Sequence, residues 1–407
     1  MKKTVLKKYA QLIAKTGLNV QKGQDVWITC DLDQPEFVQT VVEECYKLGA
    51  RDVRVDWTYQ SLTKVNVKYK KLQDLGTYSK WQEAKMQYQA DNIPCRLYIE
   101  SEDPDGLKGV DIAKMAKARQ MLYPIAKKYR DLWENKDQWC IVAVPSVKWA
   151  KKLFPALSKK QAVEKLWEAI LSCARVDENP IKAWEDHNKD LHDRCEYLNS
   201  LKIKSLHYTA SNGTDFTVGL IDRGLFNAGM ETSLQKITFN PNMPSEECFT
   251  SPMKGKADGI VYASKPLCYN AQLIENFWIR FKEGKAVEWH AEKNNDLLTK
   301  MINMDEGASY LGECALVPYD SPIQNSNILF YNTLFDENAS CHLALGTGFE
   351  SCISGYENLT LDECHKLGVN NSMIHQDFMI GTQDMNIDAT TSDGRTVPVF
   401  RNGNWAF

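Results

Sequence analysis

Hydrophobic residues in the first part of the chain alternate between strand spacing and helix spacing. Residues 25–30 and 51–57 form apolar or alternating runs typical of strands. Between them, apolar side chains recur at helical spacing, after Pro35, which suits a first helical turn, and before Gly49, which suits a helix end. Two strands joined by such a helix predict parallel pairing with a right-handed crossover.

The pattern changes near Asn199, which predicts two domains. Before Asn199, further strand-like runs lead into a long helical tract that is interrupted once, near Asn179-Pro180. After it, short alternating runs are separated by hairpin signals such as Asn212-Gly213 and Glu283-Gly284. We therefore predict an α/β protein with an N-terminal parallel-sheet α/β domain (residues 1–199) followed by an α+β domain (residues 200–407). The expected elements are strands at 96–100, 139–144, 201–210, 215–220, 259–264 and 277–282, and helices over 147–199.

Composition and charge narrow the class of protein. The chain is 43% hydrophobic, which is ample for folded cores, and its formal net charge of −4 does not favour nucleic acid or an anionic membrane as a partner. No apolar stretch reaches membrane-spanning length, and lysines interrupt the N-terminal segment where a secretion signal would be apolar. The cysteines are scattered without a CxxC pair, which predicts buried thiols in a reducing cytoplasm.

Two segments of the second domain place charged groups in apolar surroundings. Glu313 enters an apolar run that ends at Pro318. His375 and Asp377 lie two residues apart in another apolar run, so a strand would direct both side chains to one face. Such groups are costly to bury unless they are paired or bound to a metal. An ordinary hydrogen bond between His375 and Asp377 is the simpler alternative.

Two further segments carry weaker signals. Glu246 and Glu247 follow Pro244, where an exposed acidic turn is an equally good interpretation. Glu337 and His342 flank a segment of small residues. A lone histidine there is more often a hydrogen-bonded core residue than a metal ligand, but a nearby carboxylate makes the two interpretations closer in weight. Together, these oxygen and nitrogen ligands suit two divalent ions and favour a metallohydrolase.

The remaining histidines are assigned structural roles. His187 and His192 lie in a charged helical tract, and His365 lies on a predicted surface helix. His207 and His290 lie in or near strands, and the sequence pattern does not identify a carboxylate partner for either. The sequence shows no phosphate-binding loop, dinucleotide-binding fingerprint or serine-nucleophile elbow, so it does not indicate nucleotide chemistry or serine hydrolysis.

Five ordered segments also carry a family resemblance. They are residues 17–24 (GLNVQKGQ), 214–220 (TDFTVGL), 242–250 (NMPSEECFT), 305–318 (DEGASYLGECALVP) and 397–405 (VPVFRNGNW). These segments resemble the dimetal exo-aminopeptidases of bacteria typified by aminopeptidase T, aminopeptidase S and aminopeptidase II. The resemblance runs over nearly the whole chain, and chance similarity does not explain so many matches in the same order.

The resemblance implies a set of site residues, cofactors and partners. It implies two divalent ions, such as zinc, cobalt, magnesium or manganese, in a cytoplasmic homodimer that acts on short peptides. The glutamate assigned from the motif is the second of its pair, and Glu313 occupies the bridging position. The residues that match the family's ligands are Glu247, Glu313, Glu337, His342, His375 and Asp377. All lie in residues 200–407, which are therefore the expected metal-binding catalytic domain.

One position departs from the family pattern. Phe349 stands where the family often has a tyrosine that is thought to help the tetrahedral intermediate, and phenylalanine has no hydroxyl to donate. Tyr356, in the altered glycine-rich stretch that follows, is a candidate replacement.

The sequence therefore predicts metal-assisted hydrolysis of the N-terminal peptide bond of short peptides. Glu246 is the candidate general base that carries the proton from water to the leaving amine. Two alternatives stay open. A dimetal amidase or phosphoesterase would use similar ligands, but it should have Arg or Lys beside them for an anionic substrate, and these segments carry none. A non-catalytic metal-binding or peptide-binding relative is motivated by Phe349.

Overall fold

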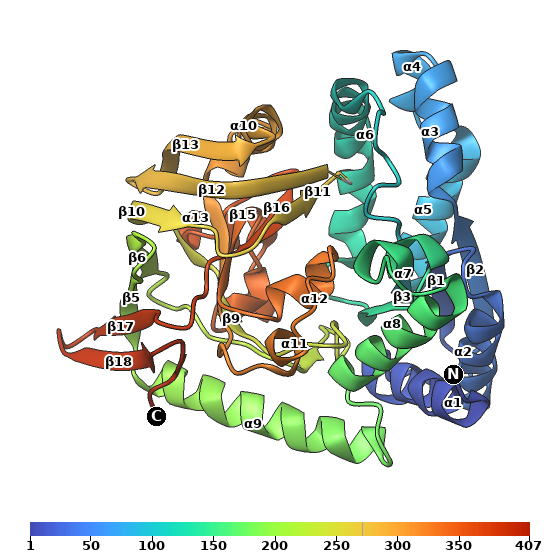
Figure 1. Ribbon diagram of the computed structural model, residues 1–407, viewed down its shortest axis with the longest axis horizontal. Coiled ribbons are helices and arrows are strands. Elements are labelled where there is room, and N and C mark those ends of the chain that lie inside the picture. Colours follow the sequence, from blue (N-terminus) through green and yellow to red (C-terminus); the bar gives the residue numbers. More distant parts are fainter. Residues whose placement is uncertain (271) are drawn as a thin grey trace. The chain divides into compact units, whose positions relative to one another are not determined.

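The computed structural model describes residues 1–270 and 272–407 of the chain (Figure 1). The chain divides into two compact units, and each is assembled from separate stretches of sequence. The first unit contains Met1–Asp186, Met230–Pro244 and Asn270–Gln272, and the second contains His187–Gly229, Ser245–Tyr269 and Leu273–Phe407. The domain boundary predicted at residue 199 stays a prediction.

A four-stranded parallel sheet forms the centre of the first unit. Its order is β2 (Asp52–Thr58), β1 (Asp25–Asp31), β3 (Cys95–Glu100) and β4 (Trp139–Ala143). Strands β1 and β2 are connected by α2 (Pro35–Lys47), so the predicted βαβ unit and its proline start are confirmed. Five of the seven positions of β1 are buried, as expected for an inner strand of a parallel sheet with both faces covered.

The helical tract predicted over residues 147–199 contains three helices, α7 (Val147–Leu153), α8 (Lys159–Cys173) and α9 (Pro180–Ser200). The prediction of a single break was wrong, because a second break falls around Pro155. Proline disfavours helical backbone at Phe154, and the Ser158 hydroxyl then caps the next helix by accepting from Gln161 N. The other elements that begin in this unit are α1 (Lys3–Leu12), which continues as a π-helical turn (Ile13–Gly17), α3 (Gln60–Tyr69), α4 (Leu72–Leu75), α5 (Lys80–Asn92), α6 (Ile112–Trp133), β7 (Glu231–Thr232) and β8 (Thr238–Phe239).

The larger sheet of the second unit has nine strands. The strand predicted over residues 215–220 is β6, and the runs predicted at 259–264 and 277–282 are the ends of longer strands, β10 and β12. The start of β10 was missed because Lys254, Gly255 and Lys256 mask its alternation. The sheet order is β11 (Leu267–Tyr269), β12 (Gln272–Lys282), β10 (Pro252–Tyr262), β6 (Asp215–Leu220), β5 (Ile203–Thr209), β17 (Asn386–Thr391), β18 (Thr396–Arg401) and β19 (Asn404–Trp405), with β13 (Lys285–Lys293) paired to β12.

A second, four-stranded antiparallel sheet lies in the core of the same unit. Its order is β16 (His375–Met379), β15 (His342–Gly346), β14 (Leu311–Leu316) and β9 (Cys248–Thr250). Every residue of β9, β14 and β15 is buried. The helices of this unit are α10 (Asn295–Ile302), which lies against β13 (Figure 1), α11 (Pro322–Asn325), α12 (Thr333–Glu337) and α13 (Leu361–Leu367), with 3-10 turns at Gly307–Ser309, Glu350–Cys352 and Tyr356–Asn358.

The architecture confirms the predicted fold class, a parallel-sheet α/β unit and an α+β unit. All twelve cysteines are free thiols, and all except Cys268 are buried, as predicted. Within the part of the chain that the structure describes, no helix combines the length and the apolar character that crossing a bilayer requires.

Candidate metal centre

One face of the four-stranded sheet gathers the predicted ligands. Glu313 on β14 lies opposite Ala344 on β15, which in turn lies opposite Asp377 on β16. His342 lies opposite Ala315 in the same ladder. Residues directly opposite one another share a face of the sheet, so Glu313, Asp377 and His342 all project to one side. The two alanines between them leave room for those longer side chains.

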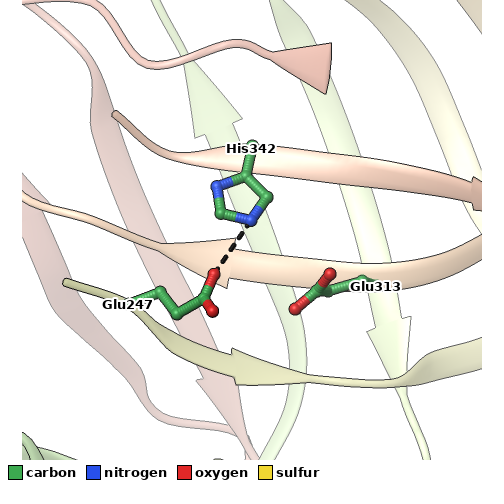
Figure 2. Close-up of side chains that lie close together, drawn as sticks. All are labelled: Glu247, Glu313 and His342. Atoms are coloured by element: carbon green, nitrogen blue, oxygen red, sulfur yellow. Dashed lines mark ion pairs between the residues drawn. The ribbon is translucent and has the colours of Figure 1, made fainter. Parts of the chain in front are cut away.

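Glu247, Glu313 and His342 form the first group of ligand candidates (Figure 2). Each offers an oxygen or nitrogen atom, and these atoms lie within 4.8 Å of one another. The side chains come from the segment before β9, from β14 and from β15, and all three residues are at least nine-tenths buried. Figure 2 shows the His342 ring turned toward Glu247, with 3.0 Å between Nε2 and Oε2.

Glu313, His375 and Asp377 form the second group, under the same distance limit. His375 Nε2 lies 3.1 Å from Glu313 Oε2 and 3.3 Å from Asp377 Oδ1. The predicted strand is confirmed as β16, in which His375 and Asp377 lie two residues apart and therefore on one face. Glu313 belongs to both groups, so the two groups have one carboxylate in common.

Both imidazoles are oriented by backbone carbonyls. His342 Nδ1 lies 3.3 Å from the Ser340 carbonyl oxygen, and His375 Nδ1 lies 2.8 Å from that of Thr347. A carbonyl oxygen can only accept, so each Nδ1 carries a proton and Nε2 is the atom that faces the carboxylates. Histidines that bind metals commonly have this arrangement, with one nitrogen on the ion and the other bonded to a backbone carbonyl or a carboxylate.

The cluster contains charged groups and buried polar atoms without hydrogen bonds, and both features suit the binding of divalent cations. His342 Nε2 and Asp377 Oδ1 are buried and make no hydrogen bond of proper geometry, even though each has a charged neighbour within 3.3 Å. Buried polar atoms without partners are costly, and a cation placed among them would satisfy them. Three carboxylates and two imidazoles form a donor set that suits zinc, cobalt or manganese.

The pKa values of the cluster reflect burial and the close pairing of carboxylates with imidazoles. Burial raises the pKa of the Glu313 carboxyl to about 7. Burial opposes the charged form of His342, but the Glu247 and Glu313 carboxylates raise the pKa of its imidazole to about 9. Burial likewise opposes ionisation of Asp377, but His375 lowers the pKa of that carboxyl to about 2. The carboxylates therefore attract positive charge, which a proton or a metal ion can supply.

Glu337 and Glu246 lie outside both groups. Glu337 is 9% exposed, and its Oε1 accepts a hydrogen bond from Asn338 Nδ2 at 3.3 Å. Glu246 is 6% exposed, so it is not part of an exposed acidic turn. Its backbone N–H donates to Asn338 Oδ1 at 2.7 Å, and its carboxylate Oε2 lies 3.8 Å from His187 Nε2.

Two histidines make contacts that the sequence did not indicate. His187, on α9, contacts the Ser245 carbonyl oxygen through Nε2 at 2.7 Å and therefore borders the Glu246 turn. No local pattern identifies this contact, because it depends on the packing of α9. The sequence did not indicate a carboxylate partner for His207, but the structure has one, since its Nε2 lies 2.8 Å from Asp215 Oδ1 on the neighbouring strand.

Phe349 lies against the ligand-bearing face. Its ring centroid is 4.8 Å from that of His375 and 5.5 Å from that of Phe249. Phe249 lies opposite Ala315 and so shares the ligands' face. Tyr356 packs instead against a cluster formed by Ile221, Ile353, Cys364 and Val369. Its suggested role as a replacement hydroxyl stays a prediction.

Known proteins resemble this chain over almost its full length. Aminopeptidase AmpS of Bacillus subtilis (strain 168) is 42% identical over 404 residues, which are 99% of this chain and 98% of that protein. Aminopeptidase 2 of Geobacillus stearothermophilus is 40% identical, with the same coverage. The structure of wild-type AmpT from Thermus thermophilus matches with a TM-score of 0.89 at 35% sequence identity and covers 100% of both chains.

The model of one protein family, described as thermophilic metalloprotease (M29), matches residues 2–405. This match and the similar proteins agree with the resemblance carried by the sequence motifs. The chain belongs to the M29 family of thermophilic metalloproteases and is a peptide-bond hydrolase.

Proposed function

We propose that this protein is a metal-dependent aminopeptidase that removes the N-terminal residue from short peptides. The observation that carries the proposal is the pair of overlapping ligand groups that share Glu313 on one buried sheet face. The similar proteins named above are aminopeptidases, which supports the same reaction. We further propose that the protein acts as a homodimer in the cytoplasm.

We propose that Glu247, Glu313, Glu337, His342, His375 and Asp377 hold two divalent ions, with Glu313 as the shared ligand. When bound, such ions supply Lewis-acid activation of a water molecule and of the scissile carbonyl. The buried face keeps Glu313, His342 and Asp377 fixed, so little reorganisation is needed during the reaction.

Glu246 is the proposed general base. It is buried next to Glu247, and its backbone is fixed by the Asn338 side chain. In this role its carboxylate accepts a proton from the attacking water and donates it to the leaving amine. Carboxylates of the cluster would bind the free ammonium group of the substrate, which explains why only the N-terminal bond would be cleaved.

Substrate blocking tests the reaction class. A peptide with a free N-terminus should release its first residue, and the same peptide with an acetylated N-terminus should resist, because it lacks the ammonium group. Chelation should abolish the activity, and added cobalt, zinc or manganese should restore it. Efficient cleavage of the acetylated peptide would indicate an endopeptidase or amidase.

Metal analysis tests the shared ligand. Protein purified without chelator should contain up to two divalent ions per chain, and Glu313→Ala should lose both. Glu306→Ala is the matched control, since Glu306 is an exposed carboxylate seven residues earlier. Full metal content in Glu313→Ala would contradict the shared-ligand assignment.

Phe349 favours one second candidate, a non-catalytic metal-binding or peptide-binding protein. That candidate becomes the better account if the protein binds two ions and turns over none of a panel of free peptides.

A further inference from the structure

We infer that Asn338 is a positioning residue that joins two of the segments proposed to hold the metal ions. The inference rests on the proposed function of the same site. Asn338 directly follows Glu337 at the end of α12 and has no exposed surface. It is neither a proposed metal ligand nor a proposed proton carrier.

The Asn338 amide bonds to both segments at once. Its Oδ1 accepts from the backbone N–H of Glu246 at 2.7 Å. Its Nδ2 donates to the Leu334 carbonyl at 2.9 Å and to Glu337 Oε1 at 3.3 Å. The orientation of the amide is dictated by its partners, because an N–H can only donate, whereas a carbonyl and a carboxylate accept.

These bonds fix atoms that the reaction needs. The N–H of Glu246 belongs to the peptide between Ser245 and Glu246, so holding it fixes the chain one residue before Glu247. The bond to Glu337 restrains the orientation of a carboxylate that is proposed to hold an ion. Glu246 and Asn338 are 92 positions apart in sequence, and one buried side chain therefore fixes the spacing of two distant carboxylate segments.

A purely structural asparagine would make a different set of contacts. Asn199 offers the comparison, because its Oδ1 accepts from Phe226 N at 2.7 Å and its Nδ2 donates to Phe226 O at 3.1 Å. Both bonds of Asn199 stabilise one backbone residue. Asn338 instead bonds to backbone groups of two different segments, Leu334 and Glu246, and also to the carboxylate of a proposed ligand, Glu337.

Asn338→Asp is the sharper test, because it keeps the volume and the acceptor of the amide. It removes the donor and places a second carboxylate beside Glu337. Asn338→Ala removes all three bonds, and Asn199→Ala is the control for losing two amide hydrogen bonds elsewhere in the same unit. The full-length, metal-free proteins are titrated with Zn²⁺ or Co²⁺ in competition with a coloured chelator, and thermal unfolding of each is recorded without metal.

Both Asn338 variants should bind at least one of the two ions about ten- to a hundredfold more weakly than the unmodified protein, as is typical when a residue that orients a ligand is lost. Asn199→Ala should keep the original affinity, even if its unfolding temperature falls. Unchanged affinity in a folded Asn338→Asp variant would overturn the inference. If Asn338→Ala does not fold, Asn338→Asp decides. Failure of the unmodified protein to bind any divalent ion would instead contradict the proposed function.

Discussion

At the scale of single residues, the centre is controlled by atoms of the main chain. The carbonyl oxygens of Ser340 and Thr347 orient the two imidazoles, and the amide of Glu246 is bonded by Asn338. Main-chain groups keep their hydrogen-bonding chemistry when a side chain changes, so these contacts depend on the path of the chain rather than on the identity of residues 340 and 347. Phe349 is the exception, since its effect on the site depends on the side chain alone.

Phe349→Tyr should raise kcat with little change in KM, because the added hydroxyl can donate to an oxyanion that forms only in the transition state. One such donor typically contributes on the order of 3 kcal/mol, or about a hundredfold in rate. Steady-state kinetics with a free dipeptide measure both constants. Tyr356→Phe is the companion variant. A neutral Phe349→Tyr together with a lower kcat in Tyr356→Phe would assign the hydroxyl to Tyr356, and no change in either would exclude both residues.

At the scale of elements, strand β14 brings the two ligand groups together because β9 and β15 flank it. At two positions of this sheet, a backbone carbonyl lies so close to the neighbouring strand that only glycine fits. A Cβ on Gly312 would lie 2.0 Å from the Thr347 carbonyl oxygen, and one on Gly346, whose φ is +109°, would lie 1.9 Å from that of Ile374. The Thr347 carbonyl also orients His375, so packing between the elements and ligand orientation depend on the same atoms.

Gly312→Ala should therefore affect stability and metal binding together. Displacing Thr347 should lower the free energy of unfolding by about 1–3 kcal/mol, as overpacking usually does, and should weaken the second ligand group. Urea unfolding and metal titration provide the two measurements. Gly394→Ala is the control, because its Cβ meets nothing within 4 Å although its φ is +84°. Loss of stability with unchanged metal affinity in Gly312→Ala would separate the two effects and contradict the prediction.

Strand β1 begins with a buried carboxylate, Asp25, whose ion pair with the exposed Arg51 makes stability depend on pH. Asp25 is 4% exposed and accepts from Arg51 Nε and Nη2 at 2.7 and 2.8 Å, and from the Tyr88 hydroxyl. The bond from Arg51 holds the pKa of this carboxyl below its usual range.

Because the pKa of Asp25 is lower in the folded protein than in the unfolded chain, where it is about 3.9, the pair stabilises fully above that pH and less as the pH falls through the lowered pKa. Arg51→Gln should therefore destabilise the protein clearly at pH 6 and less at pH 3, as measured by urea unfolding. Arg280→Gln, which breaks an exposed pair with Glu288, should show a smaller difference between the two pH values. An equal effect of Arg51→Gln at both pH values would contradict this account.

The strands of both units could be predicted wherever apolar spacing was regular, as in β1, β2 and β6. The end of α7 was missed because apolar residues continue at helical spacing past Pro155. The candidate ligands could be named because a charge in an apolar run is anomalous, as with Glu313. The contacts of Asn338 and His187 could not be predicted, since each depends on how distant segments pack.

At the scale of the whole molecule, the proposed metal binding depends on the folding of the second unit. The ligand candidates come from four strands or their flanking segments, and only the folded sheet brings them together. A ligand that binds the folded protein and not the unfolded chain stabilises the folded protein by mass action.

Adding Zn²⁺ or Co²⁺ at a hundred times its Kd should therefore stabilise the protein by about 2.7 kcal/mol for each site filled. The effect should appear as a rise in Tm that a chelator reverses. Glu313→Ala should show no such rise, because it removes the carboxylate common to both groups. A similar rise in this variant would place the stabilising ions elsewhere.

The order of the proposed ligands along the chain also determines when, during synthesis, the complete metal centre can first form. Glu247 leaves the ribosome about 130 residues before Asp377. At roughly 5–20 residues per second, that interval lasts on the order of ten seconds. During this interval, the four-stranded sheet lacks its edge strand β16, which carries His375 and Asp377. A growing chain would therefore have no complete pair of proposed sites to fill, and the full set of ions would have to come from the pool that the protein meets after synthesis has passed residue 377.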